Sequence, residues 1–313
     1  MRRFWILPVL LALALSSCGG APPEMTTLKI GVLPILDALP MYVAESQGFF
    51  AEQGVTVEFV PVSSAAERDQ LMQAGQIDGM INDLVSTMLY NKDEIQIVVV
   101  SFARTATADF PQYRVLASKD SGIETVADLA GIPIGVSEGT VIAYTTDRLL
   151  EAEGLSPDEI VMLAVPKIPD RLALLNSGEL KAANLPDPLS SLAIQGGAKV
   201  IIDDTSHPEI GNSLISFSRR VVDEHPEAIK AFMAAVEQAA AEINADKSLW
   251  SDLLTEKQLV PAPVVGTYVI PSFPTGSVPS EAQFADVLAW TQEKGLLTGS
   301  VSYSDSVDAS FLP

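Results

Sequence analysis

The two halves of this chain carry the same short landmarks in the same order. The matches are Ile30-Gly31-Val32 with Ile134-Gly135-Val136, Val60-Pro61 with Val165-Pro166, and Gly75 and Ile77 with Gly178 and Leu180. Their offsets lie between 103 and 105 residues. An ordered set of matches at nearly constant spacing predicts two lobes built on one plan. A chain of 313 residues is long enough to give each lobe its own hydrophobic core.

Strand and helix signals alternate along each half. The β-rich runs expected as strands in the first half are residues 28–32, 55–62, 77–81 and 94–101. Between them, Pro40 fits a first helical position, Gly48 fits a helix stop, and Ser64 with Glu67 fits a capping box. Such alternation predicts parallel sheets with right-handed crossovers. The expected fold class is therefore α/β, with two doubly wound lobes and a central cleft.

Two extended segments are expected to join the lobes. Residues 113–118 are expected to pass to the second lobe, and residues 212–218 to pass back. The predicted lobes are residues 28–116 with 216–313, and residues 117–215. A helix opened by Pro226 carries an apolar stripe, and with the tail that contains Trp290 it is expected to complete the first lobe.

Residues 1–17 are typical of a secretory signal peptide. Two arginines precede an apolar run from Phe4 to Leu15, which is too short to span a bilayer. The run leads into Leu15-Ser16-Ser17-Cys18, which resembles the bacterial lipoprotein box, where the cysteine is lipidated after cleavage. Residues 18–27 then indicate a flexible tether, and we expect an extracytoplasmic protein held to the cell membrane by lipid on Cys18. A short membrane anchor followed by an incidental cysteine is the alternative.

Charge and residue counts exclude several classes of function. With 19 basic and 40 acidic residues the formal charge is −21, so the chain repels nucleic acid. One cysteine and two histidines are too few for a structural zinc site, an iron–sulfur cluster or a cysteine–histidine catalytic pair. We therefore expect no metal, no cofactor and no enzymatic activity. No stripe suggests a coiled coil or an interface, so a monomer is expected.

The loops that follow the expected strands are the candidate binding loops, because ligands bind beyond the carboxyl ends of strands in open parallel sheets. The expected ligand-binding residues are Leu36, Asp37, Ala38, Ser63, Ser64, Asn82, Asp83, Arg104, Ser137, Glu138, Gly139, Thr140 and Asp187. The aspartates would accept hydrogen bonds from the ligand, and residues 137–140 would hold an acceptor group at a helix start. The alternatives are local: turn formation by aspartate, helix capping by Ser137 or Thr140, and neutralisation of Asp109 by Arg104.

The segment from Lys29 to Val60 resembles the opening of solute-binding lipoproteins of ABC importers, in the family that handles sulfonates, nitrate and thiamine-pyrimidine precursors. The resemblance continues in residues 71–83, 122–136 and 225–243. It implies a type II periplasmic-binding-protein fold, whose lobes close on a solute and deliver it to a permease with a cytoplasmic ATPase. The cysteine-rich chemistry of a fungal relative that makes thiamine pyrimidine is not expected here, because no cysteine follows Cys18.

The sequence determines the solute less well than the fold. The candidate loops offer four carboxylates against Arg104 and Lys167, whereas a sulfonate or nitrate needs clustered donors and a positive charge. We therefore expect a neutral or amine-bearing nitrogen heterocycle, such as a pyrimidine or another vitamin-like ring. The alternatives are a sulfonate- or nitrate-type oxyanion receptor, a sensory receptor for a membrane kinase, and an enzyme that uses a carboxylate pair.

Overall fold

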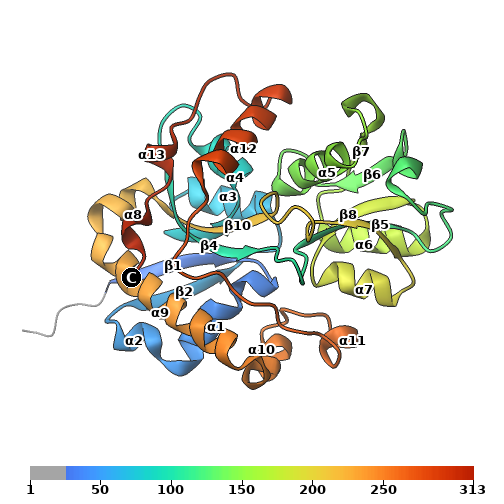
Figure 1. Cartoon of the computed structure of the whole chain (residues 1–313). Coiled ribbons are helices and arrows are strands. Elements are labelled where there is room, and N and C mark those ends of the chain that lie inside the picture. Colours follow the sequence, from blue (N-terminus) through green and yellow to red (C-terminus); the bar gives the residue numbers. More distant parts are fainter. Residues whose placement is uncertain (1–25) are drawn as a thin grey trace, which may run out of the picture.

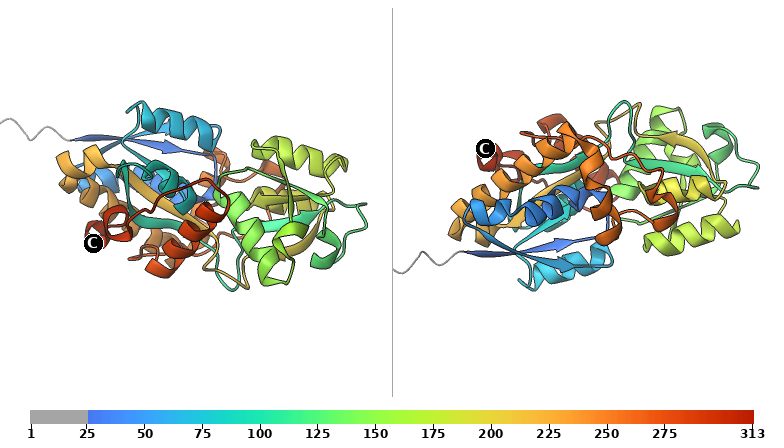
Figure 2. Two further views of the ribbon diagram at one scale, coloured as in Figure 1. Left: turned by 90° about the horizontal axis from the view of Figure 1, so that it is seen from above. Right: turned by 90° about the horizontal axis from the view of Figure 1, so that it is seen from below.

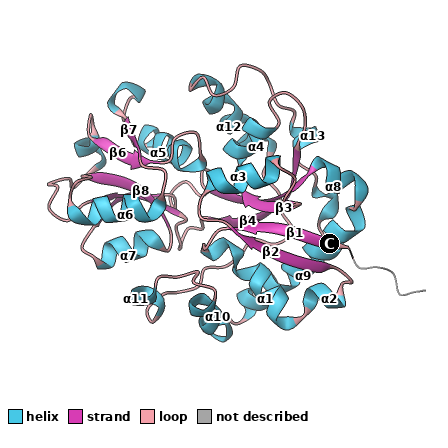
Figure 3. Ribbon diagram, turned by 180° about the vertical axis from the view of Figure 1, so that it is seen from behind, coloured by secondary structure: helices cyan, strands magenta, loops and turns pink. Residues whose placement is uncertain are grey.

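The computed structural model describes residues 26–313, so the predicted signal peptide, Cys18 and most of the tether lie outside the described residues. The described chain forms two five-stranded sheets with helices packed against them (Figure 1; Figure 3). The first sheet has the order β2-β1-β3-β10-β4, and its strands are β1 (Thr27–Val32), β2 (Thr56–Pro61), β3 (Gly79–Asn82), β4 (Ile97–Thr105) and β10 (Asn212–Ser218). The second has the order β7-β6-β8-β5-β9, and its strands are β5 (Tyr113–Ala117), β6 (Pro133–Val136), β7 (Val161–Ala164), β8 (Ala182–Pro186) and β9 (Lys199–Asp203).

The helices follow the same division. Those of the first lobe are α1 (Leu39–Gln47), α2 (Phe49–Glu52), α3 (Ala65–Gln73), α4 (Leu84–Tyr90), α8 (Arg219–Glu224), α9 (Pro226–Ala245), α10 (Ser251–Glu256), α11 (Ala262–Val265), α12 (Glu281–Glu293) and α13 (Tyr303–Ser306). Those of the second lobe are α5 (Val141–Ala152), α6 (Ile168–Ser177) and α7 (Leu189–Gln195). Short 3₁₀ turns are η1 (Leu36–Ala38), η2 (Val126–Leu129), η3 (Pro157–Glu159), η4 (Lys247–Trp250) and η5 (Ala309–Phe311). No helix within residues 26–313 has both the length and the apolar character needed to cross a membrane.

The predicted two-lobe α/β architecture is confirmed, but each sheet is mixed. β10 runs antiparallel to β3 and β4, and β5 runs antiparallel to β8 and β9. Each of these strands enters its sheet from the opposite lobe, and not from a covering helix, so it runs in the opposite direction. The prediction of wholly parallel sheets is therefore wrong for these two strands.

The segments predicted as crossings are themselves strands. β5 belongs wholly to the second sheet and begins at Tyr113, and β10 belongs wholly to the first sheet and begins at Asn212. The connections between the lobes are therefore residues 106–112 and 204–211, which run between two lobes that lie side by side (Figure 2).

The sequence repeat corresponds to equivalent strands, β1 and β6, which hold the same place in their sheets. A Cβ atom on Gly31 would lie 2.7 Å from Ile77 Cδ1, and one on Gly135 would lie 2.7 Å from Leu180 Cδ1. Both distances are shorter than van der Waals contact. The repeated glycine therefore lets a residue just before the neighbouring strand, β3 or β8, pack closely against β1 or β6.

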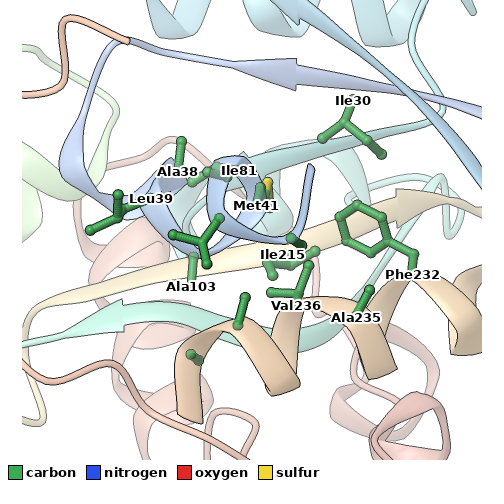
Figure 4. Packing of buried hydrophobic residues seen from close by; sticks show 14 of the residues in the cluster. Ile30, Ala38, Leu39, Met41, Ile81, Ala103, Ile215, Phe232, Ala235 and Val236 are labelled. Carbon is green, nitrogen blue, oxygen red and sulfur yellow. The ribbon is translucent and has the colours of Figure 1, made fainter. Parts of the chain in front are cut away.

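The core of the first lobe contains the apolar stripe predicted after Pro226. Six residues of this stripe are buried in one cluster: Ile229, Phe232, Met233, Val236, Ala240 and Ile243. Figure 4 shows residues of α9, such as Phe232 and Val236, facing Ile30 and Ile215 of the sheet. The stripe of this helix is thus packed against strands of the first sheet.

Trp290 joins the two lobes as well as completing the first. It is buried in a cluster that also contains Tyr144 and Leu149 of α5, a helix of the second lobe. Its ring lies edge-on to Tyr144, with 5.6 Å between centroids, and its Nε1 donates to Asp147 Oδ2 at 2.8 Å. The lobes therefore share a buried apolar contact between α12 and α5.

Candidate functional site

A cavity of about 110 Å³ lies between the lobes, beyond the carboxyl ends of β1, β2, β3, β6, β7 and β8. The first-lobe residues in its wall are Leu33, Ile35, Asp37, Ser63, Ser64, Ala65, Arg68, Ile81, Asn82, Asp83 and Ser213. The remaining wall residues are Gln112, Tyr113, Ser137, Thr140, Val141, Ile142, Pro166, Ile168, Pro186 and Asp187. A cavity of this volume holds several water molecules or one small solute.

Most of the predicted ligand-binding residues lie in this wall. The structure brings together Asp37, Ser63, Ser64, Asn82, Asp83, Ser137, Thr140 and Asp187. Three of them also begin helices: Ser64 accepts from Glu67 N, Asp83 from Ser86 N, and Thr140 from Ile142 N. These three residues therefore cap a helix and line the cavity at the same time, because each turn between a strand and the following helix lies at the cavity.

Five predicted residues do not line the cavity. Leu36 and Ala38 are fully buried in the first-lobe core, because η1 turns them inward. Arg104 is 1 % exposed and lies behind Asp37 and Asp187, which it neutralises in place of Asp109. Glu138 is exposed, and Gly139 lines an adjoining polar pocket instead. These five predictions are corrected for this cavity.

The residues that sequence reasoning missed are mainly apolar. The apolar character of an isoleucine at the end of a strand or the start of a helix gives no sign that it lines a cavity. Ile81 of β3, Ile142 of α5 and Ile168 of α6 do so. Tyr113 supplies an aromatic surface, and burial raises the pKa of its hydroxyl well above the usual value, so the hydroxyl stays protonated. Gln112 was missed because it belongs to a crossing segment and not to a strand end.

Two carboxylates of the first lobe face the cavity. Asp37 lies 3.5 Å from both Arg104 Nη1 and Gln112 Nε2. Burial raises the pKa of Asp83, an effect that the Arg68 guanidinium opposes. Both side chains retain lone pairs beyond these contacts, so the first lobe offers the cavity hydrogen-bond acceptors.

Asp187 is a second-lobe carboxylate at the centre of a buried ionic network. Arg114 Nη1 lies 2.8 Å from its Oδ1, and Arg104 Nη2 lies 3.5 Å from its Oδ2. Ser191 Oγ donates to Oδ1 at 2.6 Å, and the Tyr268 hydroxyl donates to Oδ2. Tyr268 comes from the segment after α11, so this network ties the C-terminal part of the first lobe to the second.

The cationic group in the wall, and the two that pair with Asp187 behind it, are already engaged. Of the described residues in the wall, Arg68 alone is cationic, and its donors bond Asp69 Oδ1, the Ile81 carbonyl and Ser86 Oγ. Arg104 and Arg114 lie behind the wall and pair with Asp187. The wall therefore presents carboxylates, hydroxyls and amides between apolar patches, and no free guanidinium.

Asp204 connects the two crossings between the lobes. Its Oδ1 accepts from Gln112 N at 2.8 Å and from Tyr113 N at 3.1 Å, whereas its Oδ2 has no hydrogen-bond partner among the described residues. The residue is fully buried, and burial raises its pKa to about 6 from 3.8. Because the folded protein binds this proton and the unfolded chain releases it, folding is favoured by a lower pH.

We expect the stability of the protein to fall as the pH rises from about 4 to about 6, by up to roughly 3 kcal/mol from Asp204. Asp204→Asn keeps an oxygen for both N–H donors and removes the charge, so its free energy of unfolding should change less over this range. Urea unfolding at a series of pH values measures the difference between the two proteins. Asp223→Asn, at an exposed position, is the control, and equal pH slopes for the parent and Asp204→Asn would contradict the prediction.

No group of three or more histidine, cysteine, aspartate or glutamate side chains within residues 26–313 is arranged to hold a metal ion.

Comparison with protein families gives a match to the family described as NMT1/THI5 like, over residues 36–247. The matched region includes both sheets except for β1, and all the loops that form the cavity wall beyond Ile35.

Named relatives are binding proteins. The nitrate/nitrite binding protein NrtA of Nostoc sp. is 24% identical over 71% of this chain and 55% of its own. The formylaminopyrimidine-binding protein of Halalkalibacterium halodurans is 27% identical over 53% of this chain and 51% of its own. The chain thus spans about half the length of the curated relatives it matches.

The fold matches that of solved binding proteins. The alkanesulfonate-binding protein SsuA from Xanthomonas axonopodis pv. citri, bound to MOPS, superimposes with a TM-score of 0.75 at 19% identity. The match covers 92% of this chain and 99% of that one. At this identity the likeness is one of fold.

Proposed function

This chain belongs to the NMT1/THI5-like family, and from that premise we propose that it is the solute receptor of an ABC importer. The observation that carries the proposal is the cavity, whose wall combines strand-end loops of both lobes. A solute held there would touch both lobes at once and would favour their closed arrangement by its differential affinity. The names of the nitrate- and formylaminopyrimidine-binding relatives support a small polar solute.

We propose further that the receptor works outside the cytoplasmic membrane as a monomer held by lipid on Cys18. Support comes from the sequence alone: the basic and apolar leader, the lipoprotein box and the tether to residue 27. Lipid chains contribute about 0.8 kcal/mol for each buried CH₂ group, so several chains would hold the protein firmly. The partners of this proposal are the membrane, an ABC permease and its ATPase.

The proposed solute is a neutral or amine-bearing nitrogen heterocycle such as a pyrimidine. The apolar wall and the Tyr113 ring suit the faces of a flat ring, and Asp37 and Asp83 suit its N–H donors. A nitrate or sulfonate needs free donors around its oxygens, whereas Arg68 already uses its own on protein acceptors. The proposed solute contacts are the eight predicted residues that line the cavity, named above.

Isothermal titration calorimetry tests the solute class with four probes: formylaminopyrimidine, ethanesulfonate, nitrate and bicarbonate. We expect micromolar or tighter binding of the pyrimidine, about −8 kcal/mol or better, and none of the three anions. Tight binding of an anion alone would overturn the proposed solute class and favour the oxyanion receptor. Mass spectrometry of any solute retained through native purification gives an independent identification.

A further inference from the structure

Arg171 and Arg68 occupy equivalent places in the two lobes. Arg68 lies on α3, which follows β2, and Arg171 lies on α6, which follows β7. Arg68 Cγ lies 3.8 Å from the position of a Cβ on Gly31, and Arg171 Cγ lies 3.3 Å from that of a Cβ on Gly135. Both arginines are therefore buried over the repeated glycine of their lobe, at the same sequence offset as its other landmarks.

Their partners differ. Arg68 has a carboxylate partner, Asp69, together with a carbonyl and a hydroxyl. Arg171 Nη1 bonds Ser137 Oγ and the Val165 carbonyl, both at 3.0 Å. Its Nε and Nη2 have no acceptor within residues 26–313, and no described carboxylate pairs with it. Burial without such a partner lowers the pKa of Arg171 to about 10, so it remains charged at neutral pH.

A buried charge of this kind opposes folding, because no ion pair offsets the free-energy cost of removing the charge from water. Arg171 is 0 % exposed, so it is not a surface residue whose tip reaches water. A residue that costs stability at a fixed place in the fold needs another reason to be there, and its position beside the cavity supplies one.

Arg171 lies one side chain behind the second-lobe wall. Ser137, which it bonds, lines the cavity and donates to the carbonyl of Pro166, another wall residue. Thr140, the N-cap of the twelve-residue helix α5, lines the same side. A cation and a helix N-terminus therefore act together on this wall, where the low dielectric screens their field little.

We infer that Arg171 positions Ser137 and polarises the second-lobe wall, so that this wall receives the electron-rich end of the solute. That end is a ring nitrogen, a carbonyl oxygen or an anionic oxygen. Without solute the Ser137 hydroxyl donates to the Pro166 carbonyl and the Thr140 hydroxyl to the Ser137 carbonyl, so these two hydroxyls turn from the carbonyls to donate to the solute. The opposite, N–H-bearing end then faces Asp37 and Asp83 in the first lobe. The inference rests on the proposed function and adds a direction to it: each lobe recognises one end of the solute.

The test compares Arg171→Met with Arg68→Met in the full chain. In solute-free protein we expect Arg171→Met to melt at or above the parent, by roughly 2–4 °C, because an uncompensated charge is removed. Arg68→Met should melt below the parent, because its removal leaves Asp69 and Ser86 without their partner. If Arg171→Met loses as much thermal stability as Arg68→Met, Arg171 has a structural role and the inference is wrong.

Calorimetry with the four probes named above supplies the second readout. Whichever probe binds the parent should bind Arg171→Met roughly tenfold more weakly, the loss expected for one charge-assisted hydrogen bond. Ser137→Ala should weaken binding similarly without a large change in melting temperature, and Arg171→Lys should recover most of the affinity. Unchanged affinity in both Arg171→Met and Ser137→Ala would overturn the inference.

The two proposals fail in different ways. If an anion binds the parent and the pyrimidine does not, the proposed solute class fails, while weaker anion binding by Arg171→Met still supports the inference. If none of the four probes binds, the melting comparison decides on its own whether Arg171 has a structural role, because it needs no solute.

Discussion

Tryptophan in place of Ala65 is expected to weaken solute binding by on the order of a hundredfold, or about 2.7 kcal/mol, while the protein stays folded. Ala65 is the first residue of α3, is half-buried and lines the cavity. An indole group is much larger than the methyl group it replaces and would take space from a cavity of about 110 Å³. Calorimetry with the probe that binds the parent measures the loss.

Ala66→Trp is the matched control for this variant. Ala66 follows on the same helix but is exposed and does not line the cavity. The Ala66→Trp protein should therefore bind the solute with the affinity of the parent. Parental affinity in Ala65→Trp, with a folded circular dichroism spectrum, would place the solute site elsewhere.

Asp187→Ala is expected to reduce the free energy of unfolding by about 3–5 kcal/mol. The substitution leaves the buried guanidinium of Arg104 and the partly buried one of Arg114 without their shared carboxylate, and the Tyr268 hydroxyl without its acceptor. Arg104 keeps a contact to Asp37 at 3.5 Å, so the loss comes mainly from Arg114 and from the connection through Tyr268. Urea unfolding of the solute-free protein measures it.

Asp223→Ala serves as the control for charge removal alone. Asp223 pairs with Arg219 on an exposed helix face, where such pairs contribute roughly 0–1 kcal/mol. If Asp187→Ala destabilises the protein no more than Asp223→Ala does, the network around Asp187 does not hold the lobes together.

Local chemistry made much of the fold predictable. The repeated Ile-Gly-Val landmarks correspond to β1 and β6, and the cap predicted at Ser64 begins α3. The reversed direction of β5 and β10 was not predictable, because hydrophobic pattern indicates a strand but not the direction in which it enters a sheet.

The candidate site was predictable where a polar residue follows a strand. Asp37, Asp83 and Ser137 were found in this way and lie in the cavity wall. The buried arginines of helices α3 and α6, Arg68 and Arg171, were not, because an arginine on a helix normally faces solvent. One signal pointed to Arg171: it stands 103 residues after Arg68, the offset of the Gly75 and Gly178 landmarks.

The strand order has a consequence for the nascent polypeptide. All five strands of the second sheet lie within residues 113–203, so this sheet can be completed once those residues have left the ribosome. In the first sheet, β3 and β4 cannot be joined until β10, which lies between them, has been translated. The first sheet, whose first four strands are synthesised before the second sheet, is therefore completed after it. A nascent chain that ends near residue 203 would expose the unpaired edges of β3 and β4, between which β10 later inserts.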